Sequence, residues 1–204
     1  NCSNNELDTL ALLNLPELTT IDCSYNKLNM ISFIGSPKLT NINCSVNNLT
    51  FLSFEDLILL KTINCSSNKL TDLLVSNLPV LYELNCRSNF LANLVIKDLL
   101  KLSTILCSGN LIVNLSLKNL PNLSSLEIAK NQLSSLTLSN LPNLSSLYCI
   151  ENKLKFIDVN SLNKLWFLTA TDNPLEIVLA KTGRVITDYK LPQTVNYICV
   201  DENK

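Results

Sequence analysis

Residues 18–39 read LTTIDCSYNKLNMISFIGSPKL, and this pattern recurs along the chain with a period of 21. Cysteine occupies one slot of the repeat, at positions 2, 23, 44, 65, 86, 107 and 149. Ile128 and Ala170 take the same slot in two other copies, and asparagine follows the slot by three residues each time, from Asn5 to Asn173. Because one phase is held over nine turns without an insertion, the sequence predicts a solenoid of stacked, nearly identical coils.

Each repeat contains two short apolar segments. In the first, Ile21 and Cys23 alternate with Asp22, which predicts a strand with the first two side chains inward and the aspartate outward. The second, 28–33, repeats the spacing and is expected to be extended or a short 3₁₀ turn. A coil of this length leaves no room for a full α-helix as well, and proline precedes the next strand in five repeats, at 16, 37, 79, 121 and 142. Successive strands should be parallel, with right-handed crossovers.

The cysteines are interpreted as packing and not as chemistry. Side chains in register on parallel strands keep their Cβ atoms about 5 Å apart, beyond the usual disulfide range, and a straight ladder does not converge on a metal ion. Ile128 and Ala170 show that the slot requires apolar character. The asparagines are expected to satisfy main-chain groups at a sharp turn, and to pair with their equivalents in the next coil. We assign no catalytic residue, metal ligand or cofactor.

The repeat frame predicts a single domain over 1–204. Residues 1–17 form a partial first repeat, 18–164 hold seven full repeats, and 165–204 hold a last repeat, a capping hairpin and a terminal strand. The hairpin is expected from strands at 177–180 and 185–187 around a turn at 181–184, and the next strand of the first type at 195–200. Cys199 would then point away from the core, as an accessible thiol or as half of a disulfide to a residue beyond Lys204. Because Asn1 lies in mid-repeat, the chain is interpreted as a piece of a longer protein.

Composition excludes several classes of function. The 16 basic and 17 acidic residues give a net charge of −1, which disfavours nucleic acid as a partner. The sequence has no histidine, the commonest general base and metal ligand. No apolar run approaches the roughly 20 residues that a membrane helix needs, so membrane insertion is not expected.

The repeat resembles the leucine-rich-repeat consensus, with cysteine at the third leucine. In its length of 21 and its cysteine ladder it is similar to internalin-like bacterial surface proteins, and its tail at 197–202 is similar to flavobacterial-type secreted repeat proteins. The resemblance implies a solenoid of the α/β-horseshoe class, mostly β with little or no helix, and a parallel sheet on the concave face. It also implies location at the bacterial surface or secretion, and a role in adhesion or host contact.

Most outward strand positions hold small polar residues, and the exceptions are the candidate ligand-binding residues. Three share one coil: Tyr82, Glu83 and Arg87. Five belong to later coils: Leu106, Tyr148, Ile150, Trp166 and Phe167. Outward aromatic residues are enriched at interfaces. The alternative is that Trp166 and Phe167 pack beneath the terminal hairpin.

These observations predict a non-enzymatic recognition module that binds a protein or a glycan along its concave face. The alternative function is a rigid spacer within a larger surface protein. An enzyme is not expected, because no nucleophile–base pair, phosphate loop or metal spacing is found. The chain is expected to be a monomer, although an end-to-end dimer is also compatible with trimmed ends.

Overall fold

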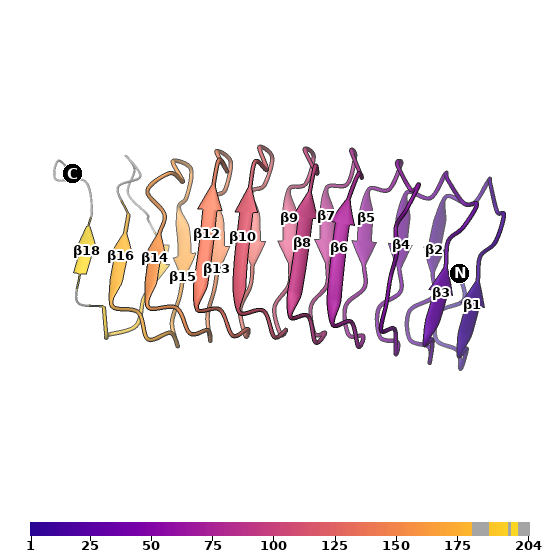
Figure 1. The fold of residues 1–204 in the computed structure, drawn as a ribbon, viewed down its shortest axis with the longest axis horizontal. Helices are drawn as coiled ribbons and strands as arrows, with labels where there is room; N and C mark the ends of the chain where they lie inside the picture. The colour runs from indigo at the N-terminus through magenta and orange to yellow at the C-terminus, as the bar shows by residue number, and fades with distance from the viewer. Residues whose placement is uncertain (181–187, 196, 200–204) are drawn as a thin grey trace. The chain divides into compact units, whose positions relative to one another are not determined.

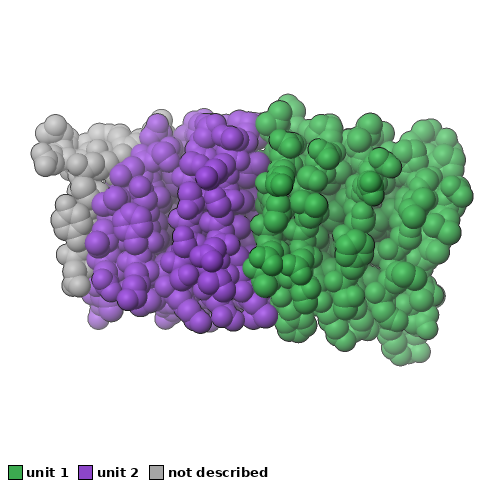
Figure 2. Space-filling view, viewed as in Figure 1, with its two compact units in different colours: residues 1–102 green, residues 103–204 purple. Residues whose placement is uncertain are grey.

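The computed structural model describes residues 1–180, 188–195 and 197–199, and divides into two compact units, 1–102 and 103–204 (Figure 2). All the regular elements in the described part of the chain are short β-strands, and no helix occurs there. Each unit is a parallel β-solenoid in which every coil crosses from a first row of strands to a second row and back (Figure 1). The one-domain assignment stays a prediction.

Unit 1 contains four strands of the first row and four of the second. In the first row β2 (Thr20–Asp22), β4 (Asn41–Asn43), β5 (Thr62–Asn64) and β7 (Glu83–Asn85) pair in sequence, all parallel. In the second row β1 (Thr9–Ala11) pairs with β3 (Met30–Ser32), and β6 (Asp72–Ser76) pairs with β8 (Asn93–Lys97). The coil between those of β3 and β6 has no second-row strand at residue 51, the position equivalent to Met30 and Asp72.

Unit 2 repeats the arrangement. Its first row contains β9 (Thr104–Leu106), β11 (Ser125–Glu127), β13 (Ser146–Tyr148), β15 (Phe167–Thr169) and β17 (Asp188–Lys190). In its second row β10 (Asn114–Lys118) pairs with β12 (Ser135–Ser139), and β14 (Phe156–Asp158), β16 (Ile177–Leu179) and β18 (Tyr197–Cys199) form a three-stranded sheet. Paired residues lie one repeat length apart in the sequence, as Leu147 and Leu168 do. The pair of β16 and β18 is the exception, because Ile177 pairs with Tyr197, one residue less than the repeat length.

The core lies between the two rows and consists mainly of leucine and isoleucine. Six ladder cysteines are buried in it: Cys23, Cys44, Cys65, Cys86, Cys107 and Cys149. Ile128 and Ala170 are equally buried at the same slot, which confirms that the position requires an apolar side chain. The predicted extended segments are confirmed in the first row, and in the second row except at residues 51–54, which form no strand.

The ladder asparagines join each coil to the one before it. The side-chain amide of Asn47 donates to the carbonyl of Cys44 in its own coil at 3.0 Å and to that of Cys23 in the previous coil at 3.1 Å. Its Oδ1 accepts the main-chain N–H of Leu28 at 3.0 Å. The same set of bonds recurs at Asn68, Asn131, Asn152 and Asn173. The predicted pairing between equivalent asparagines is wrong. The nitrogen and the oxygen of each side-chain amide are instead hydrogen-bonded to main-chain groups of two neighbouring coils.

The terminal coil differs from the predicted one. The first-row strand that follows β15 is β17, at the regular repeat spacing, so the placement of that strand at 195–200 was wrong. Asp188, Tyr189 and Lys190 are all exposed and carry no alternating apolar signal, which concealed the strand in the sequence. Both edges of β16 are taken by parallel partners, β14 and β18. The other predicted hairpin arm, 185–187, and the side chain of Cys199 lie outside the described residues.

Replacement of Asn68 by alanine should strongly destabilise the fold. The change leaves the buried N–H of Leu49 without a partner, and removes one of the two amide donors from the carbonyls of Cys44 and Cys65, which keep Asn47 and Asn89. One buried unsatisfied group costs about 1–3 kcal/mol, so a loss of this size is expected in urea unfolding monitored by circular dichroism.

The control for this experiment is Asn48→Ala. Asn48 is partly exposed, and its side chain donates one long bond, 3.4 Å, to the carbonyl of Lys27. An equal effect of the two substitutions would contradict the role given to the asparagine ladder.

Candidate functional site

Outward side chains of the first-row strands form a surface in each unit that we call the strand face. In unit 1 it is mostly made of amides and hydroxyls that bond to one another. The Thr40 hydroxyl donates to Asn41 Oδ1, and Asn41 Nδ2 donates to the Thr62 hydroxyl, both at 2.7 Å. A shallow depression of about 470 Å³ lies over this part of the face and is lined by Thr20, Asp22, Asn43, Asn64 and Glu83 among others. The surface is therefore polar and internally satisfied.

Asp22 is the carboxylate at the start of this surface. The Ser24 hydroxyl donates to it at 2.6 Å, and the Ser24 amide and Asn43 Nδ2 donate to the same oxygen. The Ser24 side-chain bond is the main cause that lowers the pKa of Asp22, and the other two donors add to it. The group is held as an anion and is poorly suited to act as a general acid.

The three candidate residues in unit 1 lie in one coil, as the sequence indicated. Tyr82 is exposed, and Glu83 is half-buried at the first position of β7, opposite Thr62. The main-chain N–H of Arg87 donates to Asn85 Oδ1 at 3.2 Å, and its carbonyl accepts the N–H of Ser67. These residues bring one aromatic and two charged side chains to an amide-rich face.

In unit 2 three candidate residues form one aromatic cluster, which we define as Tyr148, Trp166 and Phe167. The ring centroids of Tyr148 and Phe167 are 4.6 Å apart, and those of Trp166 and Phe167 are 5.9 Å apart with the planes at 70°. Trp166 keeps 52% of its surface exposed, whereas Tyr148 and Phe167 are half-buried. The geometry places three rings in contact across two neighbouring coils.

A buried hydroxyl lies beside the aromatic cluster. Thr169 is paired in register with Tyr148 and is 2% exposed, and its Oγ1 has no hydrogen-bond partner in the described structure. A buried polar atom without a partner is unusual in a folded protein. Because this atom is buried, it is not part of the surface that the cluster presents to a ligand.

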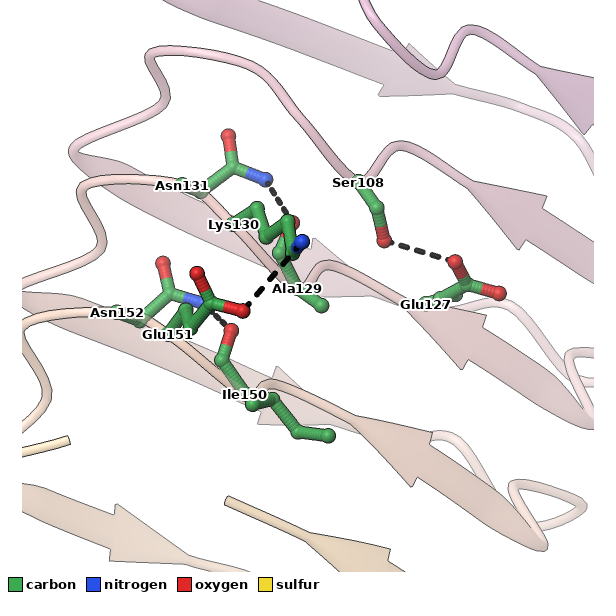
Figure 3. Close-up of polar contacts among 8 residues, drawn as sticks. All are labelled: Ser108, Glu127, Ala129, Lys130, Asn131, Ile150, Glu151 and Asn152. Carbon is green, nitrogen blue, oxygen red and sulfur yellow. Dashed lines mark hydrogen bonds and ion pairs between the residues drawn. The ribbon is translucent and has the colours of Figure 1, made fainter. Parts of the chain in front are cut away.

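The two other candidates in unit 2, Leu106 and Ile150, are half-buried. Ile150 lies among polar contacts, which Figure 3 shows: Lys130 forms an ion pair with Glu151 at 3.5 Å, and Ser108 donates to Glu127 at 2.9 Å. The carbonyl of Ile150 accepts the side-chain amide of Asn152, which belongs to the ladder. Leu106 lies in the register column of Glu127 and Tyr148, as predicted.

Burial keeps several thiols of the cysteine ladder protonated in the folded chain. The Sγ atoms of Cys23, Cys44 and Cys65 each lie 3.5 Å from a carbonyl oxygen of the next coil, to which the thiol donates. Burial raises the pKa of Cys23 and of Cys149 to about 12, and holds that of Cys65 well above its usual value. Since the thiolate is the reactive form, these groups are poor nucleophiles and poor metal ligands. No group of three or more metal-binding side chains occurs among the described residues.

The sequence analysis missed a set of exposed apolar residues beside the second row in unit 1. Met30, Phe51 and Leu74 are among the most exposed large apolar side chains. The sequence did contain a signal for this set. Positions 30, 51, 72 and 93 are equivalent in the repeat, and the polar residues Asp72 and Asn93 show that this position faces outward, so the apolar Met30 and Phe51 are exceptions there. It was missed because candidate residues were sought on the first-row strands alone.

No protein-family model matches the sequence, and no curated protein shows significant similarity to it. Solved structures do match. A leucine-rich-repeat protein of Leptospira interrogans has a TM-score of 0.72 at 21% identity, over 92% of this chain and 50% of that one. YopM from Yersinia enterocolitica has a TM-score of 0.69 at 25% identity, over 91% and 42%. The complex of LRIM1 and APL1C gives 0.61 at 22% identity, over 90% and 38%.

These matches confirm the leucine-rich-repeat solenoid and the resemblance to bacterial proteins of this fold. The chain spans half or less of the length of each of the three matched chains. The described part of the structure contains no helix that is long and apolar enough to span a membrane.

Alkaline pH should destabilise the fold through the buried thiols. The pKa of a cysteine is near 9 when exposed, and burial raises it in the folded state, so above pH 9 the unfolded chain releases protons that the folded chain keeps. Stability is therefore complete below pH 9 and is lost as the pH rises toward the folded pKa, by about 1 kcal/mol per pH unit for each thiol.

Urea unfolding between pH 8 and pH 10.5 measures this loss. In a double variant, Cys65→Val and Cys149→Val, stability should fall less steeply with pH than in the natural sequence. The variant lacks two thiols whose protons the unfolded chain releases and the folded chain keeps. Lysine and tyrosine titrate alike in both proteins, so the difference in slope isolates the two thiols. Identical slopes would show that these thiols are not held protonated by burial.

Proposed function

We propose that this chain is a non-enzymatic recognition module of a secreted or surface-exposed bacterial protein, and that it binds a protein partner through the strand face of unit 2. The aromatic cluster of Tyr148, Trp166 and Phe167 is the observation that carries the proposal. Clustered tyrosine and tryptophan side chains supply most of the energy in many interfaces. The surrounding first-row positions are small hydroxyl residues, such as Ser125 and Ser146, that suit the rim of such a site.

A protein partner is favoured by the fold. Leucine-rich-repeat modules generally bind other proteins, and one structure with the same fold is the complex of LRIM1 with APL1C. A role in adhesion or host contact would follow if the partner belongs to a host cell. The alternative function as a spacer requires no exposed aromatic residues, and therefore leaves the cluster without an explanation.

A glycan is the second candidate ligand, because one observation favours it. Trp166 presents a half-exposed indole, and sugar rings have an apolar face that suits an aromatic side chain. Stacking of a sugar ring on the indole would use this feature. The partner screen below contains both classes of ligand.

The non-enzymatic part of the proposal is supported by the chemistry of the side chains. The sequence has no histidine, the described ladder thiols Cys23, Cys65 and Cys149 have raised pKa values, and Asp22 is fixed as an anion by Ser24. None of these groups is a general base or nucleophile near neutral pH.

The test is a screen of the chain against arrays of host proteins and glycans, followed by titration of each ligand found. Trp166 is the single tryptophan of the chain, so its fluorescence reports directly on the proposed site. A ligand that buries the half-exposed indole should shift the emission to shorter wavelength. Phe167→Ala should weaken binding at least about tenfold, which corresponds to about 1.4 kcal/mol.

The matched control is Phe156→Ala in the same unit. Phe156 is also a partly exposed phenylalanine, but it belongs to the second-row strand β14. Unchanged binding by Phe156→Ala beside weakened binding by Phe167→Ala would support the site. If both variants bind as the natural chain does, the aromatic cluster is not the site. The spacer function would gain support if neither array yields a ligand.

A further inference from the structure

A carboxylate lies on each side of the aromatic cluster of unit 2. Tyr148 is paired in register with Glu127 of β11. Phe167 is paired in register with Asp188 of β17. Residues in register on neighbouring strands lie side by side on one face of the sheet, with the strands about 4.8 Å apart. The strand face therefore carries an acidic side chain next to each of these two rings.

Main-chain hydrogen bonds of β17 fix the position of Asp188. Its N–H donates to the carbonyl of Trp166 at 3.1 Å, and the carbonyl of Lys190 accepts the N–H of Ala170 at 2.8 Å. The side chain of Asp188 is exposed, and it forms no ion pair with any residue of the described ranges. Its carboxylate can therefore bind a ligand that lies on the ring of Phe167.

The two carboxylates differ in their bonding. Glu127 is engaged within the chain, because its Oε1 accepts the hydroxyl of Ser108 at 2.9 Å (Figure 3). Asp188 accepts no hydrogen bond from another side chain in the part of the molecule that the structure describes. Asp188 is thus the acidic side chain beside the cluster that a ligand can use.

Lysines also occur near the cluster, but not in register with its rings. Lys190 is paired with Thr169, and the Nζ of Lys164, in the turn before β15, donates to Asn143 Oδ1 at 2.6 Å. The charged residue in register with Phe167 is a carboxylate and not an ammonium group. This arrangement favours a cationic ligand over an anionic one at that ring.

Aromatic faces and carboxylates attract the same kind of ligand group. The face of an aromatic ring is partially negative, and it attracts a cation within about 6 Å of the ring centroid. The centroids of Trp166 and Phe167 are 5.9 Å apart, so a group between them is within reach of both rings. Among cationic side chains, arginine fits best. Its guanidinium is planar, stacks on aromatic faces and donates paired hydrogen bonds to a carboxylate.

We propose that Trp166, Phe167 and Asp188 form a subsite for an arginine side chain of the partner protein. The guanidinium stacks on the half-exposed indole and donates to the carboxylate of Asp188. An apolar ligand alone would take this carboxylate out of water without giving it a partner, which is unfavourable. The inference rests on the proposed function, because it names the partner group that the aromatic cluster receives.

The probe is N-acetyl-arginine amide, titrated into the full chain labelled with nitrogen-15. Trp166 is the single tryptophan, so its indole N–H gives one assigned signal in the NMR spectrum. A saturable shift of this signal is expected, with a Kd on the order of 10 mM. The citrulline analogue has the same shape without the charge and should bind at least about fivefold more weakly. The lysine analogue should also bind more weakly, because an ammonium group does not stack.

Two chain variants locate the carboxylate. Asp188→Asn keeps the size of the side chain and should weaken arginine binding at least about threefold. Asp158→Asn is the matched control, since Asp158 is also an exposed strand aspartate of unit 2 but belongs to the second-row strand β14. This variant should bind arginine as the natural chain does. Circular dichroism checks that both variants are folded.

Four outcomes would overturn the subsite. They are no saturable shift with arginine, equal binding of arginine and citrulline, equal binding of arginine and lysine, and equal binding by Asp188→Asn and Asp158→Asn. The probe is a small molecule, so its result does not depend on the partner screen. A partner whose binding is weakened by Phe167→Ala but not by Asp188→Asn would overturn the subsite and leave the proposed function standing.

Discussion

The fold depends on the hydrogen bonds of the ladder asparagines. Each amide bridges the main chain of two coils at the turn after the first-row strand, as Asn47 does between Cys23, Cys44 and Leu28. A single coil is too short to bury enough apolar surface alone, so its stability comes from its neighbours. The asparagines supply the polar part of that coupling where the chain turns, and the leucines and cysteines supply the apolar part.

This constraint separates the positions that fold the chain from those that are free to evolve. Inward positions hold apolar side chains, mainly leucine, isoleucine and cysteine, because each must fit against its equivalents in the neighbouring coils. Outward positions of both rows carry no such requirement. It is on these that the aromatic cluster around Phe167 and the apolar residues around Phe51 are found. Both features are exceptions to a polar pattern that the repeat would otherwise maintain.

The sequence predicted the inward positions well and the outward ones less well. The slots of Cys44 and Asn47 follow from spacing alone, because periodicity reports what every coil shares. It does not report what one coil does differently. The interruption at residues 51–54 and the strand at Asp188–Lys190 depend on single coils. Positive φ angles at Tyr25 and Val46 were also not foreseen, since these residue types rarely adopt them, and stacking imposes the turn on each coil regardless of residue type.

The central claim is that the exposed aromatic residues serve binding and not stability. A saturation mutagenesis library of the chain, displayed on yeast and scored for resistance to protease, tests it directly. The account predicts that resistance falls for substitutions at Asn47, Asn68 and Leu84, which are buried, and is kept for polar substitutions at Trp166 and Phe51. If polar residues at Trp166 and Phe51 reduce resistance as much as those at the buried positions, these side chains stabilise the fold and the account is wrong.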